Sequence, residues 1–473
     1  MKQYWNKTKV ICTIGPASAE PDILKKMILA GMDVARFNFS HGVPSEHVIK
    51  IRMLQALAAK LKMPTAILQD LPGPKIRIGL LKDNVLVLKE GQKFFLTSKK
   101  IMGTASGVHL NNPKFLKSLK PNNLVYLNDG LVKLIVKKTR KDTVDCEVVA
   151  GGKIYSKKGV NCPGKIYDFD PVTPYDFKCL KYGIKAGVDF VAVSFVQRAE
   201  DILKVKKYLK KHGSTALIIA KIERKVAFDN IDQIIKVSDA VMVARGDLGI
   251  EANLEEVPFL QKEIISKCNV LGRPVITATQ MLDSMVTNPR PTRAEVTDIA
   301  NAIIDGTDAL MLSEETAIGK YPVNTIQVML NIALKTEGKR KSFARPVSFS
   351  VCEDAGLVKE LSRSAVYVAN NLAAKAIVVP TNNVHSVSWL SRLRPDSVVA
   401  GVTSDKEVFK KLILFWGVYP QLVKKFGGLR DTLKMSIDIL RHKGMLKKKD
   451  NVVILLTDDN HLFSSNIMEV RRV

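Results

Sequence analysis

The chain has 473 residues, of which 46% are hydrophobic and 25% charged, so it is long enough for about two to four globular domains with large cores. Its 73 Lys and Arg residues outnumber 46 Asp and Glu residues, which gives a formal charge of +27. The basic residues are scattered and lack the interleaved aromatic residues of a base-stacking surface. We therefore favour a solvated basic surface or an anionic substrate over nucleic-acid binding.

The cysteines and the apolar stretches exclude several further classes. The six cysteines show no Cys-x-x-Cys spacing and no neighbouring histidine cluster, so neither a zinc site nor a disulfide framework is expected. Residues 1–5 lack the apolar core of a signal peptide. No apolar stretch approaches the roughly 18 residues of a membrane span. We expect a cytoplasmic protein with no membrane partner.

Strands and helices alternate at the start of the chain. Apolar runs at residues 8–15, 33–40 and 65–70 are typical of buried parallel strands. Amphipathic stretches at about 21–30 and 45–61 are expected to form the helices between them, the first stopped by Gly31.

The alternation breaks off and later resumes. Residues from about 75 to 168 contain short β-type runs with turn signals, which predicts an inserted β domain. After Pro174, strands are expected at about 188–194, 216–222, 239–244, 274–279 and 308–312, each followed by a helix. Three strands before the insert and five after it predict a (β/α)8 TIM barrel.

The predicted protein is therefore α/β, with three domains. Residues 1–71 and 169–342 form the barrel, and residues 72–168 form an inserted small β-barrel lid domain. Residues 343–473, with buried strands near 375–380, 397–402 and 451–456, form a C-terminal α/β sheet domain.

The most informative stretch is Lys221-Ile222-Glu223, at the end of one predicted barrel strand. Because strand side chains alternate, Lys221 and Glu223 point the same way. Asp247 follows the next strand, so two carboxylates are expected at one barrel mouth, where they suit Mg²⁺ and a phosphate-bearing substrate. Other polar residues are expected at the same ends: Arg36, Asn38, Ser40, Asp70, Thr279 and Ser313.

Over essentially its whole length the sequence resembles the pyruvate kinase family. The matching blocks occur in the family's order. They are residues 11–18, 36–42, 73–77, 158–161, 221–223, 242–249, 278–282, 293–296 and 298–317.

The resemblance implies transfer of the phosphoryl group of phosphoenolpyruvate to ADP, giving pyruvate and ATP, in a cytoplasmic homotetramer with a mobile lid. It implies Mg²⁺, or Mn²⁺, held by Glu223 and Asp247, with Lys221 and Arg36 stabilising the transferred phosphate. Further roles follow residue by residue. The substrate carboxylate would be held by Gly246, Asp247 and Thr279. The enolate would be protonated through a relay that includes Thr279 and Ser313. The nucleotide would be bound by Asn38, Phe39, Ser40, His41, Arg77 and Lys158.

Four departures from the family pattern carry expectations of their own. Many members bind K⁺ at positions matching Asn38, Ser40, Asp70 and residue 71, with threonine at 71 and glutamate at 75. Here Leu71 and Lys75 stand instead, so we expect activity without K⁺, the lysine ammonium supplying the monovalent charge. Glycine is usual where Glu314 stands, and two aspartates are common where this chain has Asn128-Asp129. These two changes could alter the rate without changing the reaction.

The fourth departure lies in the C-terminal domain. The loops at 381–386 and 457–465 lack the glycines of the family's sugar-phosphate loops, and Asp458 and Asp459 would repel a phosphate. We therefore expect weak or no activation by fructose bisphosphate.

Two rival functions remain open from the residues. One is another Mg²⁺-dependent barrel lyase acting on phosphoenolpyruvate or pyruvate, which would need no nucleotide lid. The other is a basic nucleic-acid-binding protein on a barrel scaffold, which would show steeply salt-dependent binding.

Overall fold

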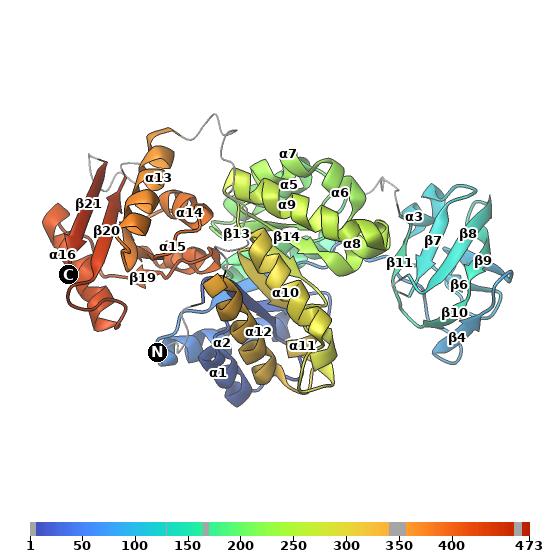
Figure 1. Ribbon diagram of the computed structural model, residues 1–473. Coiled ribbons are helices and arrows are strands. Elements are labelled where there is room, and N and C mark those ends of the chain that lie inside the picture. Colours follow the sequence, from blue (N-terminus) through green and yellow to red (C-terminus); the bar gives the residue numbers. More distant parts are fainter. Residues whose placement is uncertain (1–5, 129, 164–169, 340–355, 458–465) are drawn as a thin grey trace.

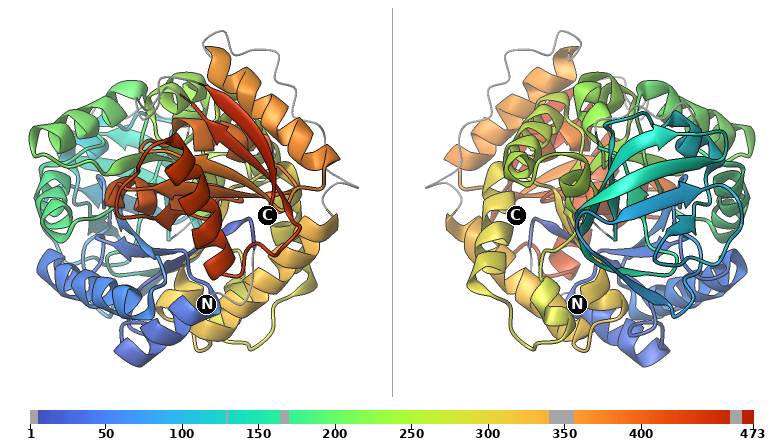
Figure 2. Two further views of the ribbon diagram at one scale, coloured as in Figure 1. Left: turned by 90° about the vertical axis from the view of Figure 1, so that its left-hand side faces the viewer. Right: turned by 90° about the vertical axis from the view of Figure 1, so that its right-hand side faces the viewer.

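The computed structural model describes residues 6–128, 130–163, 170–339, 356–457 and 466–473. These residues form three bodies in a row, with the barrel in the middle (Figure 1). The inserted β domain lies at one end of the barrel and the C-terminal domain at the other, as the two end-on views confirm (Figure 2).

Eight parallel strands of the described chain close into a barrel in the order β1-β16-β15-β14-β13-β12-β3-β2. This confirms the predicted (β/α)8 barrel. Nearly all residues of these strands are buried, as expected for parallel strands covered on both faces. The strands are β1 (Lys9–Thr13), β2 (Val34–Asn38), β3 (Ala66–Asp70), β12 (Phe190–Val193), β13 (Leu217–Ile222), β14 (Ala240–Ala244), β15 (Val275–Ala278) and β16 (Ala309–Leu312).

Helices surround the barrel, and their ends follow local sequence signals. Thr173 and Asp176 form a capping box at the start of α4, and the αL residue Gly187 ends that helix. Gly31 ends α1 in the same way, at φ 116°. The outer helices are α1 (Pro21–Ala30), α2 (Pro44–Leu61), α4 (Pro174–Ala186), α5 (Ala199–Lys211), α7 (Ile231–Val237), α9 (Val257–Leu271), α10 (Arg293–Asp305) and α12 (Pro322–Lys339).

Three short helices start at the mouth of the barrel, directly after a strand or one turn beyond it. They are α6 (Lys225–Asp229), α8 (Arg245–Glu251) and α11 (Glu314–Ala317). Because they begin at the carboxyl ends of β13, β14 and β16, their first residues belong to the face where barrel enzymes carry their chemistry.

The chain between β3 and α4 forms the lid. Its described strands make a six-stranded sheet, β11-β7-β8-β9-β5-β6, and a two-stranded sheet, β10-β4, with their own hydrophobic core. The lid lies at the mouth of the barrel, in front of it in the right-hand view of Figure 2. Its elements are β4 (Val85–Leu88), β5 (Lys93–Thr97), β6 (Gly107–His109), α3 (Pro113–Ser118), β7 (Leu124–Leu127), β8 (Val132–Thr139), β9 (Thr143–Ala150), β10 (Gly152–Tyr155) and β11 (Val160–Asn161).

The C-terminal domain contains a sheet of the order β19-β18-β17-β20-β21 among the described residues. The predicted strands β17 (Ala376–Pro380), β18 (Val398–Thr403) and β20 (Asn451–Leu456) are present, and β19 (Gln421–Leu422) and β21 (Ile467–Arg472) were not foreseen. Strand β21 pairs antiparallel with β20 at the edge of the sheet and alternates between half-buried and exposed residues. The helices are α13 (Gly356–Asn371), α14 (His385–Arg392), α15 (Lys406–Lys411) and α16 (Leu429–His442).

A buried ion pair joins this domain to the bottom of the barrel. Arg394 Nη1 lies 2.6 Å from Asp308 Oδ1, and both side chains are almost completely buried. Lys9 Nζ donates to the Val418 carbonyl at 2.7 Å beside it. The C-terminal domain is thus attached at the face of the barrel opposite the lid.

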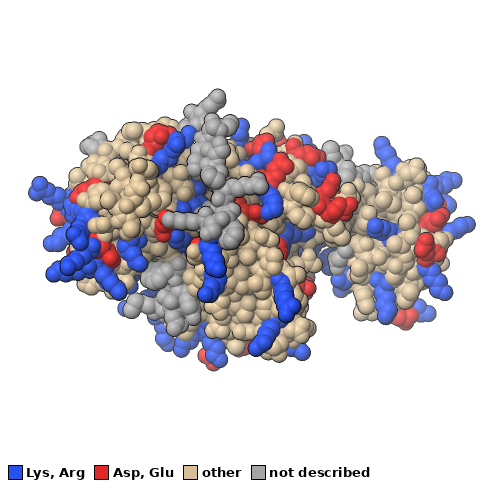
Figure 3. All heavy atoms as spheres, viewed as in Figure 1, with Lys and Arg blue, Asp and Glu red and all other residues tan. Residues whose placement is uncertain are grey.

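The surface agrees with the charge pattern of the sequence. On the face shown in Figure 3, Lys and Arg side chains are distributed over both the lid and the C-terminal domain. None of the helices in the described ranges is long and apolar enough to cross a membrane.

Candidate active site

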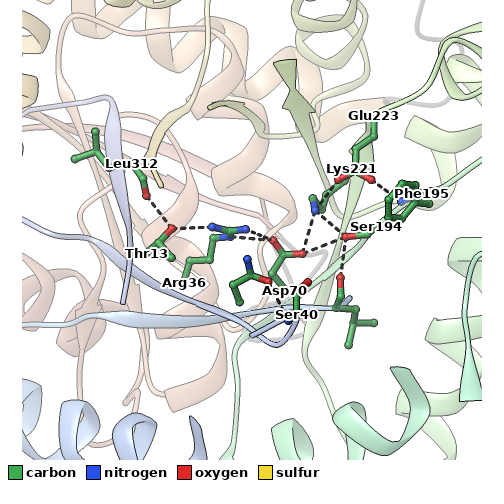
Figure 4. A network of polar contacts seen from close by, with 11 residues as sticks. Thr13, Arg36, Ser40, Asp70, Ser194, Phe195, Lys221, Glu223 and Leu312 are labelled. Carbon is green, nitrogen blue, oxygen red and sulfur yellow. Dashed lines mark hydrogen bonds and ion pairs between the residues drawn. The ribbon is translucent and has the colours of Figure 1, made fainter. Parts of the chain in front are cut away.

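The centre of the barrel mouth is a chain of buried charges from three strands. Arg36 in the middle of β2 donates to Asp70 Oδ2 through Nε at 2.9 Å and Nη2 at 2.6 Å (Figure 4). Lys221 Nζ lies 3.2 Å from Asp70 Oδ1 and 2.6 Å from Glu223 Oε1. Lys221 and Glu223 thus point the same way, as the strand alternation predicts, and form an ion pair, which Asp70 at the end of β3 joins to Arg36.

The charges fix one another's protonation state. Burial alone would lower the pKa of Lys221, but Asp70 and Glu223 outweigh it and raise that pKa above the ordinary value. Burial would raise the pKa of Asp70, but Lys221 and Arg36 outweigh it and hold that pKa below its usual range. Lys221 thus remains a cation, although its side chain is only 11% exposed.

Two hydroxyl groups complete this network, and sequence reasoning missed both. Ser194 accepts a hydrogen bond from Lys221 Nζ at 2.7 Å and donates to the Leu71 carbonyl at 2.8 Å. Thr13 accepts from Arg36 Nη1 at 2.8 Å and donates to the Leu312 carbonyl at 2.9 Å. Thr13 ends β1 and Ser194 directly follows β12, so their place at strand ends was the available signal.

Glu223 and Asp247 are the predicted metal ligands. Glu223 is 1% exposed, and its Oε2 accepts the Phe195 amide at 2.7 Å while Oε1 faces Lys221. Asp247 lies in the first turn of α8, and its charge contributes to raising the pKa of Lys221, so it acts on the same site. Across the described ranges, no three His, Cys, Asp or Glu side chains form a metal-binding group. Two carboxylates fit Mg²⁺, which usually keeps several waters and takes further oxygens from substrate phosphates.

The turn after β15 is held in a strained conformation. Thr279 has φ 69° and Gln280 has φ 53°, a region that is uncommon for β-branched or bulky residues. Thr279 Oγ1 accepts the Gly246 amide at 2.8 Å, and the Thr279 carbonyl accepts from Arg245 Nη2 at 2.7 Å. The start of α8 and the end of β15 are therefore tied together at the candidate carboxylate-binding residues.

Ser313 lies beside a buried carboxylate that was not predicted as a site residue. The Ser313 amide donates to Glu315 Oε2 at 2.6 Å, and the Leu282 amide donates to Oε1 at 3.1 Å. Burial raises the pKa of Glu315 despite these amides. The sequence feature that could have indicated Glu315 was its position in the first turn of the helix that follows β16.

A cavity of about 950 Å³ lies between the lid and the barrel mouth. Gly246, Asp247, Thr279 and Ser313 all line it, together with residues of the lid. Lys221, Glu223, Arg36 and Asp70 form the network described above and are not among its lining residues. The predicted residues therefore form two groups, a cavity wall and a buried charge cluster. Asp247 connects them, because it lines the cavity and its charge also acts on Lys221.

The predicted nucleotide-binding residues lie in two places. Asn38, Phe39, Ser40 and His41 form the turn after β2, where Asn38 Oδ1 accepts the Ser40 amide at 3.1 Å and the Phe39 ring stacks on His47. On the lid, Arg77 forms an isolated antiparallel β-bridge with Gly159, the residue after Lys158.

Lys75 lies near charged groups of both the barrel mouth and the lid. Burial, followed by the neighbouring charges of Lys221 and Arg77, lowers the pKa of Lys75 to about 8, and Asp70 and Asp247 oppose this shift. The Lys75 ammonium thus lies within the electrostatic field of the Asp70 and Asp247 carboxylates. Leu71 is buried, and its carbonyl accepts from Ser194.

A closed barrel with paired cations and carboxylates at its mouth and a lid above suits an enzyme that transfers a phosphoryl group. The comparisons with known proteins specify which one. The family described as "Pyruvate kinase, barrel domain" matches residues 5–326, and "Pyruvate kinase, alpha/beta domain" matches residues 359–471. The chain belongs to the pyruvate kinase family and is a phosphotransferase.

Individual relatives agree over most of the chain. A pyruvate kinase of Sporosarcina psychrophila is 43% identical over 91% of this chain and 74% of its own length. One from Thermococcus litoralis is 40% identical over 95% of this chain and 94% of its own length. The crystal structure of a pyruvate kinase from Cryptosporidium parvum superposes with a TM-score of 0.90 at 31% identity, covering 99% of this chain and 96% of that one.

The substitution Asp70→Asn tests the electrostatic role of Asp70. It should lower the free energy of unfolding by about 3 kcal/mol at neutral pH, because two buried cations lose their shared carboxylate. The pKa of Asp70 is depressed in the folded state, so its contribution is present above the unfolded value of about 3.9 and is lost as pH falls through the folded value. Urea denaturation should therefore show the difference from wild type shrinking at acid pH.

The matched control is Asp83→Asn, at an exposed aspartate of the lid, which should leave stability unchanged. A stability of Asp70→Asn equal to that of wild type at neutral pH would contradict this account.

Proposed function

We propose that this enzyme transfers the phosphoryl group of phosphoenolpyruvate to ADP, the final step of glycolysis. The observation that carries the proposal is the buried Lys221 ammonium, held between Asp70 and Glu223 at the barrel mouth. In the reaction the bond between phosphorus and the enol oxygen breaks and its electrons stay on the enolate. A β-phosphate oxygen of ADP forms the new bond, and the enolate takes up a proton to give pyruvate.

The cations on either side of Asp70 supply the charge stabilisation. Lys221 and Arg36 would contact the phosphoryl oxygens during transfer, where preorganised charges in a buried site act most strongly. Their geometry is set before substrate arrives, because Asp70, Ser194 and Thr13 hold both side chains. Glu223 and Asp247 would hold Mg²⁺, or Mn²⁺, which when bound neutralises negative charge on substrate oxygens.

The strained turn would bind the carboxylate of the substrate. The Gly246 amide donates to Thr279 Oγ1 at 2.8 Å and the Thr279 hydroxyl donates to the Ala278 carbonyl at 2.6 Å, so a substrate carboxylate would replace Thr279 as the acceptor of the Gly246 amide. Thr279 and Ser313 line the same cavity and would deliver the proton to the enolate through water. Glycine at position 246 permits the close approach that this binding needs.

The lid would bring the nucleotide to the transferred phosphate. Arg77 and Lys158 would bind its phosphates, with the Asn38–His41 turn on the barrel side. Closure over the cavity would exclude water, so that the phosphate passes to ADP rather than to solvent. A homotetramer in the cytoplasm is what the family resemblance further implies.

The substitution Lys221→Met tests the central assignment. It keeps the length of the side chain and removes the charge, so turnover should fall by about 10²-fold or more. A coupled assay that follows pyruvate release with phosphoenolpyruvate, ADP and Mg²⁺ measures this, and calorimetry should still detect Mg²⁺-dependent substrate binding. Lys262→Met, at an exposed lysine paired with Asp305 on the outer helices, is the control and should keep wild-type turnover.

Activity is proposed to be independent of K⁺, because the Lys75 ammonium lies in the field of Asp70 and Asp247. Turnover in buffer free of K⁺ and Na⁺ should equal that in K⁺ buffer, and Lys75→Gln should lower turnover and make it respond to added K⁺. A collapse of wild-type turnover in the K⁺-free buffer that K⁺ restores would refute this.

We also propose weak or no activation by fructose bisphosphate. The loop at 381–386 contains no glycine, and Asn382 Oδ1 accepts hydrogen bonds from Thr403 and Ser404 at the end of β18, so the loop is tied to the neighbouring strand. Asp458 and Asp459 of the second loop lie outside the described residues. Titration of fructose bisphosphate into the coupled assay should leave the KM for phosphoenolpyruvate within about twofold, whereas a large shift would show that the effector binds.

A further inference from the structure

One buried carboxylate joins the barrel mouth to the base of the lid. Glu251 is the last residue of α8 and is 4% exposed. Its Oε2 lies 3.4 Å from Arg224 Nε, and its Oε1 accepts from Asn161 Nδ2 at 3.4 Å. Arg224 belongs to the barrel and Asn161 to the lid, so Glu251 contacts both bodies.

On the barrel side, the contact reaches the candidate metal site. Arg224 directly follows Glu223 and is 1% exposed. Its Nη1 donates to Gln197 Oε1 at 3.1 Å, which fixes the guanidinium from a second side. Movement at Glu223 and movement at Arg224 are therefore linked through one peptide unit.

Glu251 is also linked to the second candidate metal ligand. Asp247 and Glu251 are four residues apart in α8, so they lie on the same face of the helix, one turn apart. The helix that presents Asp247 to the metal thus presents Glu251 to the lid.

On the lid side, the contact reaches the candidate nucleotide residues. Asn161 lies in β11, which pairs with β7, and it follows Lys158 by three residues. The Lys158 carbonyl accepts the Ile78 amide at 3.0 Å, next to Arg77. Both predicted phosphate-binding cations therefore lie on the segments at the lid base that Asn161 anchors.

From this geometry we propose that Glu251 is a positioning residue that couples the two halves of the reaction. Through Arg224 and α8, the position of the Glu251 side chain depends on the positions of Glu223 and Asp247. Through Asn161, Glu251 in turn sets the position of the lid base, which carries Arg77 and Lys158. Loading of the metal and phosphoenolpyruvate then favours the lid position that binds ADP, and ADP favours substrate binding by the same factor. The inference rests on the proposed function, since it names the regulation of that site.

Two substitutions interrupt the link at different points. Glu251→Gln keeps the shape but removes the negative charge and one of the two acceptor oxygens, so it loses the ion pair with Arg224 and weakens the shared contact with Asn161. Asn161→Ala removes the lid contact and leaves the ion pair of Glu251 with Arg224 in place. The second variant keeps the test decisive if the first does not fold.

The control is Asp308→Asn, which breaks a buried arginine–carboxylate pair of the same kind at the opposite face of the barrel. It should lower stability without affecting the coupling. Thermal unfolding of all variants shows how much of any change is general destabilisation.

The main measurement is ADP affinity with and without phosphoenolpyruvate and Mg²⁺. In both test variants the gain in ADP affinity on adding substrate should fall by about tenfold, within the range typical of coupling between sites. Because the coupling is reciprocal, the KM for ADP and the KM for phosphoenolpyruvate, each measured with the other substrate saturating, should both rise by a similar factor, while kcat at saturation stays close to wild type.

A second measurement needs neither metal nor turnover. Hydrogen exchange of the Val160 amide, which donates to the Ile76 carbonyl at the lid base, should be faster in both variants than in wild type and unchanged in Asp308→Asn. Wild-type coupling and exchange in both test variants, or equal losses in Asp308→Asn, would overturn the inference. A wild-type enzyme that fails to transfer phosphate would instead overturn the proposed function, while the exchange comparison would still test the link.

Discussion

The active site depends on keeping the Lys221 ammonium group charged although its side chain is almost completely buried. An unpaired buried charge is costly, so Lys221 requires the carboxylates of Asp70 and Glu223 beside it. Asp70 in turn forms an ion pair with a second cation, Arg36. The two cations are held by one shared anion, and this leaves them poised for a further anion such as a phosphoryl group.

This arrangement exists only because the barrel closes. Asp70, Arg36 and Lys221 come from β3, β2 and β13, and the hydroxyls of Ser194 and Thr13 come from the ends of β12 and β1. Parallel pairing brings the carboxyl ends of all these strands to one face. The site is thus a consequence of strand register, and a shift of one residue would turn each of these side chains to the other side of its strand.

The two attached domains use the two faces of the barrel differently. At the bottom, Arg394 and Asp308 form a buried pair that fixes the C-terminal domain. At the top, the lid leaves a cavity of about 950 Å³, and the described contact of Asn161 with Glu251 is a long hydrogen bond of 3.4 Å. The pair of Arg394 with Asp308 is thus shorter and more deeply buried than the described contact of Asn161 with Glu251.

The sequence by itself determined the eight barrel strands, the position of the insert and the charged residues Lys221, Glu223 and Asp247, because buried parallel strands are continuous apolar runs whose ends stand out when they carry charge. It did not reveal β21, whose alternating edge pattern resembles an exposed segment, or the roles of Ser194, Thr13, Glu315 and Glu251. Serine, threonine and glutamate are common at strand and helix ends, and nothing local distinguishes one that contacts a distant partner. Only the tertiary structure decided that Asp70 lies between Arg36 and Lys221 and that Glu251 joins Arg224 to Asn161, since each of these contacts joins residues at least 27 positions apart in the sequence and forms only when the chain is folded.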